Sequence, residues 1–153
     1  MCFRRFVWNS GEIRFLEEAQ FNETSNNGLL PMKIRIHDDS IRLRLDRSEV
    51  DTIGKGRPVD CRTRFAGGAE FRYRLLSADC DAVSANYDDG RIEVRLPRST
   101  ATHWATDETE VSIRGENDVG DGAMSLLIEK DFECLDPRDG EDQSNRFVNP
   151  KAV

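Results

Sequence analysis

The sequence is poor in the residues that most often carry catalysis or hold metals. It has two histidines, His37 and His103, which offer little material for acid–base catalysis. Its four cysteines are widely spaced and form no Cys-x-x-Cys pair: Cys2, Cys61, Cys80 and Cys134. Such spacing predicts neither a zinc motif nor a disulfide framework and favours reduced thiols in the cytoplasm. We therefore expect no cofactor and assign no catalytic residue.

Long apolar runs are also missing. No stretch approaches the ~20 residues that a membrane-spanning helix needs. Arg4 and Arg5 are not followed by the continuous apolar segment of a secretory signal. The sequence thus predicts a cytoplasmic protein without a membrane partner.

Positive charge is scarce in the last third of the chain. The net charge is −7, and residues 32–98 hold 14 basic and 12 acidic side chains, whereas residues 99–153 hold 5 and 13. Because phosphate contacts dominate the affinity of proteins for nucleic acids, this acidity argues against general nucleic-acid binding. The partners that we expect are an unknown protein or a small anionic ligand.

Alternation of apolar and polar residues dominates the chain from Met32 onward. Segments 33–36 and 41–45 flank a polar turn and predict a half-buried β-hairpin. The alternation recurs at intervals of about ten residues, in 59–65, 71–75, 83–87, 92–96, 110–114 and 123–130. No internal repeat of useful length is apparent.

Two short helices interrupt these strands. Asp46 and Glu49 have the spacing of a capping box for a helix over 47–53, and Pro97 favours a helix start at 98–105. The elements together predict an α+β fold that is mainly antiparallel β. We expect about eight short strands in a curled sheet or partly closed barrel.

The pattern divides the chain into three parts. Residues 1–31 lack clear periodicity, and we expect either a poorly packed extension or a start assigned upstream of Met32. Residues 32–135 are predicted to form a single globular domain. Residues 136–153 are predicted to form an acidic, irregular tail.

Arginines fall opposite the apolar positions of most predicted strands. The candidates for binding an anion are Arg35, Arg42, Arg44, Arg62, Arg64, Arg72 and Arg74. If the sheet is open, they face water and form ion pairs worth about 0–1 kcal/mol each. If the sheet closes around them, they line a channel whose guanidinium groups suit phosphate or carboxylate.

The tail holds a second, weaker group of candidates. A thiol and several carboxylates could bind a divalent ion together with a distant ligand such as His103; they are Cys134, Asp136, Glu141 and Asp142. Two alternatives are a tail laid along a sheet edge with Phe132 and Leu135 buried, or a tail folded across the protein's own arginines. His103 itself is expected to face solvent or bond locally, because the local sequence supplies no metal-binding partners.

Two motifs stand out at the ends of the patterned region. The first reads Met-Lys-Ile-Arg-Ile from Met32, then Ser-Ile-Arg-Leu-Arg-Leu from Ser40 and Ser-Glu-Val from Ser48. The second reads Ile-Glu-Lys-Asp-Phe-Glu-Cys-Leu from Ile128, followed by an arginine and a Glu-Asp pair. Over about 32–150 the chain resembles a family of small uncharacterised bacterial proteins, a domain of unknown function.

The resemblance implies no activity. Members of this family often have histidine where this chain has Asp136, so a metal site built from a cysteine and that histidine would lack one ligand here. We therefore favour a non-catalytic binding or interaction domain. The alternative is a protein or enzyme that takes a small anionic ligand, phosphate or carboxylate, on an arginine-lined sheet face.

Overall fold

The computed structural model describes residues 32–152, so the expectation for residues 1–31 lies outside the described residues. Within that range the chain forms eight strands, two α-helices and one short 3-10 turn, η1 (Ala66–Gly68). The strands are β1 (Lys33–Ile36), β2 (Ser40–Leu45), β3 (Val59–Arg64), β4 (Glu70–Ala78), β5 (Ser84–Asp88), β6 (Arg91–Pro97), β7 (Ser112–Asp118) and β8 (Ala123–Lys130). The helices are α1 (Arg47–Gly54) and α2 (Arg98–Thr106). The predicted number of strands and helices is confirmed.

The eight strands form two sheets rather than one curled sheet. Sheet A has the strand order β1-β2-β8-β7, sheet B has the order β3-β4-β6-β5, and neither sheet is closed. Each sheet contains one parallel pair, β2 with β8 and β4 with β6. The α+β class is confirmed, but the expectation of an antiparallel sheet closing toward a barrel is wrong in detail, because both sheets are mixed. The cause is that each helix carries the chain from one sheet to the other.

The described chain consists of two halves with the same order of elements. The first half is β1-β2-α1-β3-β4 and the second is β5-β6-α2-β7-β8. The pairing follows the same rule in both, since β2 pairs in parallel with β8 just as β6 pairs in parallel with β4. A trace remains in the sequence: Ile-Arg-Leu-Arg-Leu-Asp-Arg-Ser from Ile41 matches Ile-Glu-Val-Arg-Leu-Pro-Arg-Ser from Ile92. The expectation of no internal repeat is therefore wrong.

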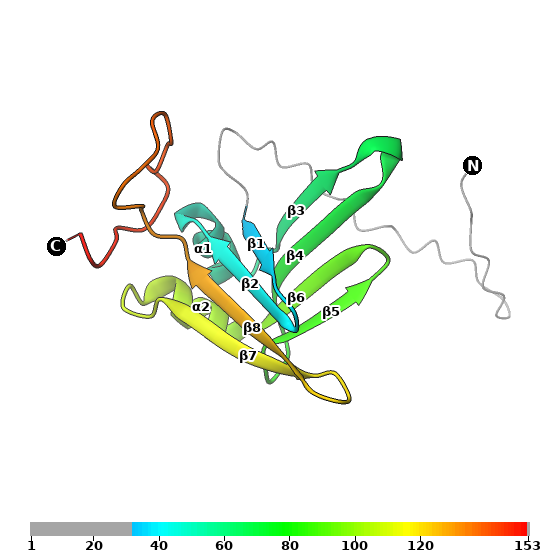
Figure 1. Ribbon diagram of the computed structural model, residues 1–153. Coiled ribbons are helices and arrows are strands. Elements are labelled where there is room, and N and C mark those ends of the chain that lie inside the picture. The colour runs from blue at the N-terminus through cyan, green and yellow to red at the C-terminus, as the bar shows by residue number, and fades with distance from the viewer. Residues whose placement is uncertain (1–31, 153) are drawn as a thin grey trace, which may run out of the picture.

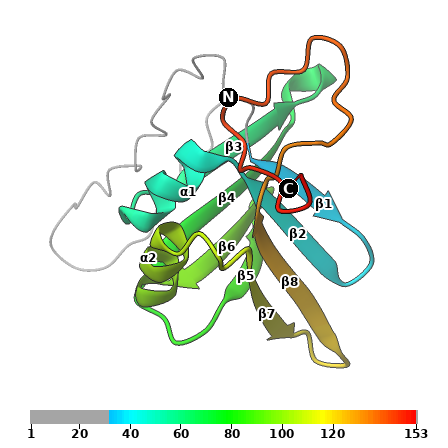
Figure 2. The ribbon, with the colours of Figure 1, turned by 90° about the vertical axis from the view of Figure 1, so that its left-hand side faces the viewer.

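Both helices begin where a strand ends. The Asp46 side chain accepts a hydrogen bond from the amide of Glu49, and the Glu49 carboxylate accepts one from the amide of Asp46, which completes the predicted capping box of α1. Helix α2 follows Pro97 without a side-chain cap. Figures 1 and 2 show α1 and α2 side by side at one end of the two sheets. They approach so closely that a Cβ on Gly54 would overlap Ala105 Cβ.

The core lies between the inner faces of the sheets and beneath the helices. It includes Leu45, Ile53, Leu75, Leu96 and Trp104, all with fully buried side chains. Cys61 is buried there as a small apolar residue, as its alternating position indicates. No helix among the described residues is long and apolar enough to span a membrane.

The segment after β8 is irregular but attached to the domain. A single bridge pairs Phe132 with Phe147, and Arg146 is buried with ion pairs to Asp131 and Glu141. The expectation that Leu135 is buried is wrong, because its side chain is 60% exposed. The tail is thus fixed by Phe147 and Arg146 instead.

Candidate functional site

The predicted arginine face is split between the outer faces of the two sheets. Strand alternation holds as predicted, so the arginines point away from the apolar core. Arg35, Arg42 and Arg44 lie on sheet A, whereas the other four candidates lie on sheet B: Arg62, Arg64, Arg72 and Arg74. The seven candidates therefore form no common channel.

We call the basic face of sheet A the group Lys33, Arg35, Arg42, Arg44 and Arg114. Cross-strand register places Lys33 opposite Arg44 and Arg35 opposite Arg42. Leu127 on the central strand β8 lies opposite Arg42 on β2 and opposite Arg114 on β7. The five side chains therefore share one surface.

The basic face of sheet A has fewer acids than cations. Glu129 accepts hydrogen bonds from Arg42 Nη2 at 2.5 Å and from Arg44 Nε at 3.1 Å, so one carboxylate serves two guanidinium groups. Lys33 Nζ pairs with Asp131 Oδ2 at 2.7 Å. The carboxylate of Asp131 is also 3.4 Å from the buried guanidinium group of Arg146, so its negative charge is shared between two cations. By strand alternation Glu116 and Asp118 lie on the same side of β7 as Arg114, so four acids face the five cations and the excess of positive charge is small.

More of the arginines of sheet B have an acidic partner, although Arg62 and Arg91 lie opposite Arg72 on the two neighbouring strands. Arg74 Nε bonds Asp60 Oδ1 at 2.5 Å, and Glu70 lies within 3.7 Å of Arg62 and 3.9 Å of Arg64. Arg72 donates a long bond of 3.5 Å to the carbonyl of Asp89. This face is mainly a ladder of surface ion pairs, each of which contributes little free energy.

The predicted tail candidates do not converge. Cys134 is exposed, and its thiol lies 3.4 Å from the carbonyl oxygen of Asp136. Glu141 accepts a bond of 2.6 Å from Arg146, and the side chain of Asp142 accepts one from the amide of Ser144. These bonds lower the pKa of both carboxyl groups. The carboxylates of Glu141 and Asp142 are thus engaged within the tail.

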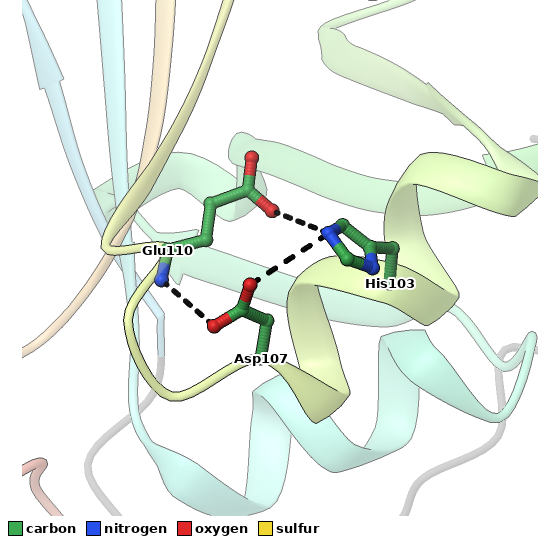
Figure 3. Close-up of side chains that lie close together, drawn as sticks. All are labelled: His103, Asp107 and Glu110. Carbon is green, nitrogen blue, oxygen red and sulfur yellow. Dashed lines mark hydrogen bonds and ion pairs between the residues drawn. The ribbon is translucent and has the colours of Figure 1, made fainter.

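A different group brings metal-ligand atoms together. Figure 3 shows His103, Asp107 and Glu110 facing one another at the end of α2. His103 Nε2 is 3.7 Å from Asp107 Oδ2 and 3.8 Å from Glu110 Oε2, and the three ligand atoms lie within 4.8 Å of one another. Among residues 32–152 this is the single set of three or more such residues. The side chain of His103 is 70% exposed, as predicted, but the expectation that the local sequence lacks partners for it is wrong.

Local structure explains how these three residues meet. His103 lies in the last turn of α2, and Asp107 follows four residues later as the C-cap. Asp107 Oδ1 then accepts bonds from the amide and hydroxyl of Thr109 and from the amide of Glu110. These bonds lower the pKa of Asp107, the hydroxyl of Thr109 having the largest effect. The i,i+4 spacing of His103 and Asp107 is visible in the sequence. The turn that brings Glu110 back beside His103 is not.

A buried lysine supports this turn from below. Lys130 is 2% exposed, and its Nζ donates a bond of 2.5 Å to the carbonyl oxygen of Asp107. It also lies 5.6 Å from the ring centroid of Trp104 and 5.4 Å from that of Phe147. Burial lowers the pKa of this amine. Lys130 therefore ties the end of β8 to the backbone of the cluster.

His103 also borders a surface pocket on the side of α2. The pocket is lined by Asp79, Cys80, Arg98, Ser99, Thr102, His103 and Thr106. The imidazole thus stands between this pocket and the two carboxylates. A ligand bound at the cluster would be accessible from solvent.

Comparison with known proteins identifies a family but no function. Residues 32–151 match the model of a family of unknown function, DUF7009. No curated protein matches the chain, and no solved structure does.

Proposed function

Because the chain belongs to DUF7009, a family of unknown function, we propose from its own surface that it is a binding domain for a small anionic ligand, phosphate or carboxylate. The binding site is the basic face of sheet A. The observation that carries this proposal is the opposition of Arg35 and Arg42 on neighbouring strands. Like charges directly opposite each other destabilise a sheet, and an anion bound between the two arginines would reduce that repulsion.

Unused hydrogen-bond donors support the same site. Arg42 Nε is buried and has no hydrogen-bond partner among the described residues. Arg35 is exposed on the edge strand β1. Guanidinium groups on adjacent strands offer several N–H donors, a type of donor that suits the oxygens of a phosphate or carboxylate. Excess charge and a spare donor thus coincide on this face, and on sheet B Arg72 Nε is likewise buried without a hydrogen-bond partner among the described residues.

A first prediction tests this face with defined anions. Inorganic phosphate, triphosphate and citrate are titrated into the full chain and followed by calorimetry. Replacing Arg35 and Arg42 together by Gln should weaken the affinity for the anion that binds by at least about tenfold, or 1.4 kcal/mol. Glu129 keeps Arg44 as a partner in this variant, so we expect the fold to persist.

The matched control lies on the other sheet. Arg64→Gln removes an arginine that is 70% exposed and paired with Glu70, and it should leave anion affinity unchanged. Equal losses in both variants, or no binding of any of the three anions to the unmodified chain, would refute the proposed site.

A further inference from the structure

We propose that His103, Asp107 and Glu110 form a binding site for a divalent transition-metal ion, Zn²⁺ being the best fit. The site lies at the end of α2 and is distinct from the basic face of sheet A. Each residue supplies one ligand atom: His103 Nε2, Asp107 Oδ2 and Glu110 Oε2. Solvent supplies the remaining ligand.

The spacing of the three atoms fits a single ion. Ligands held tetrahedrally at ~2.1 Å from Zn²⁺ lie about 3.4 Å apart. The imidazole nitrogen is 3.7 Å from one carboxylate oxygen and 3.8 Å from the other. All three ligand atoms lie within 4.8 Å of one another, and rotation of the side chains that brings them to the tetrahedral spacing would complete the coordination.

Hydrogen bonding alone does not explain this geometry. A protonated Nε2 carries one hydrogen and can direct it to one acceptor, yet both carboxylates approach the same nitrogen. Both distances also exceed hydrogen-bond length. A metal ion on the neutral imidazole would satisfy all three atoms at once.

Glu110 provides an independent observation. Its Oε2 is shielded from solvent and has no hydrogen-bond partner among the described residues. A buried carboxylate oxygen without a partner is costly, because it loses its hydration and gains nothing in return. This oxygen is also the one that faces His103. The orphaned atom thus points to the position that a cation would occupy.

The surroundings hold the ligands in place. Three donors from Thr109 and Glu110 fix Asp107 Oδ1, which leaves Oδ2 directed at the imidazole. Lys130 holds the carbonyl oxygen of Asp107 from the core. Fixed partners of this kind orient metal ligands and raise the affinity of a site. The site is therefore preorganised on the side of its carboxylates.

The donor set selects the class of metal. One imidazole with two carboxylates suits Zn²⁺ or Mn²⁺, and the affinity of such ligands rises along the first-row series from Mn²⁺ to a maximum at Cu²⁺, with Zn²⁺ bound more tightly than Mn²⁺. Mg²⁺ and Ca²⁺ prefer oxygen ligands in larger number. We therefore expect Zn²⁺ to bind more tightly than Mn²⁺, and Mg²⁺ to bind far more weakly than either.

The chain contains its own control. His37 is the other histidine, its side chain is 69% exposed, and it lies 3.4 Å from a single carboxylate, Asp38. In the full chain, an equimolar addition of Zn²⁺ should shift the imidazole NMR resonances of His103 and leave those of His37 in place. Equal responses of both histidines would overturn the proposal, because exposure alone would then account for binding.

Variants separate this site from the tail thiol. His103→Ala and Glu110→Gln should each weaken Zn²⁺ binding at least tenfold by calorimetry, whereas His37→Ala and Cys134→Ser should not. His103 and Cys134 are exposed, so these changes leave the core untouched. Full-strength Zn²⁺ binding in His103→Ala, or its loss in Cys134→Ser, would overturn the proposal.

Discussion

At the scale of single residues, Glu49 shows how a capping residue becomes sensitive to pH. Its two carboxylate oxygens accept hydrogen bonds from the amides of Met32, at 2.6 Å, and Asp46, at 3.1 Å. Burial, with a further contribution from the charge of Asp46, raises the pKa of Glu49 to about 8. The group that joins α1 to the start of β1 therefore titrates near neutral pH.

This shift predicts the sign of a pH effect on stability. Glu49 has an ordinary pKa of 4.5 when unfolded and about 8 when folded, so between these values the folded state binds more protons. The free energy of unfolding should then fall as pH rises from about 5 to 8. Denaturant unfolding at a series of pH values measures the slope.

Glu49→Gln is the test of that assignment. The variant should lose the decline between pH 5 and 8 that Glu49 causes, even if its stability is lower at every pH. Cys61 does not confuse the result, because burial raises the pKa of its thiol to about 12. An unchanged slope in Glu49→Gln would assign the pH dependence to another group.

The sequence predicts which side chains lie on a polar face better than it predicts which residues lie beside them. Alternation placed Arg35 and Arg42 on a polar face because side-chain direction follows from the strand period. It could not show that Arg62 belongs to the other sheet, because sheet membership depends on long-range pairing. The sequence identifies His103 as a candidate but does not pair it with Glu110, because Glu110 reaches it only through a turn stabilised by Asp107.

At the scale of elements, the crossing of α1 and α2 is the tightest contact between helices. Gly54 and Ala105 occupy matching positions in the two halves, and each stands near the end of its helix. The absence of a side chain on Gly54 lets Ala105 approach. The two helices can therefore pack directly over the core.

Exchanging the small side chains at this helix crossing should change the stability of the protein. Gly54→Ala should lower the free energy of unfolding by about 1–3 kcal/mol, because the new methyl group overlaps Ala105. The backbone of Gly54 is helical and tolerates alanine, so the cost comes from packing. Thermal and denaturant unfolding measure it.

The reverse change supplies the control. Adding Ala105→Gly to Gly54→Ala moves the methyl group to the other helix and should recover most of the lost stability. The single variant Ala105→Gly should show a much smaller penalty than Gly54→Ala. No recovery in the double variant would mean that the helices do not cross as described.

At the scale of the whole molecule, two local hairpins per half were predictable, but the way the halves combine was not. Turn signals such as Asp89-Gly90 indicate which strands pair as neighbours, and β5 does pair with β6. The parallel pairs join strands that are far apart in the chain, and alternation carries no information about them. The repeat is hard to detect in the sequence because few identities survive between the halves.

The two open sheets are joined at their edges by side chains. Asn117 on β7 donates a bond of 2.6 Å to the carbonyl oxygen of Ala85 on β5 and accepts one of 3.2 Å from its amide. The side-chain amide of Asn117 thus bonds the backbone of β5 as a neighbouring strand would, and it connects sheet A to sheet B. On the opposite side, the hydroxyl of Tyr73 donates to the carbonyl oxygen of Met32 at 2.6 Å. Side-chain bonds thus link the sheets without closing a barrel.

Asn117→Ala should therefore weaken the whole domain rather than one loop. The change leaves both the amide and the carbonyl of Ala85 without a partner, which should lower the free energy of unfolding by about 1–3 kcal/mol. The exposed neighbour Asn86 supplies the control, and Asn86→Ala should stay within about 0.5 kcal/mol of the parent. Hydrogen exchange should show faster exchange at Ala85 in the Asn117 variant alone. Equal effects of the two substitutions would mean that Asn117 does not join the sheets.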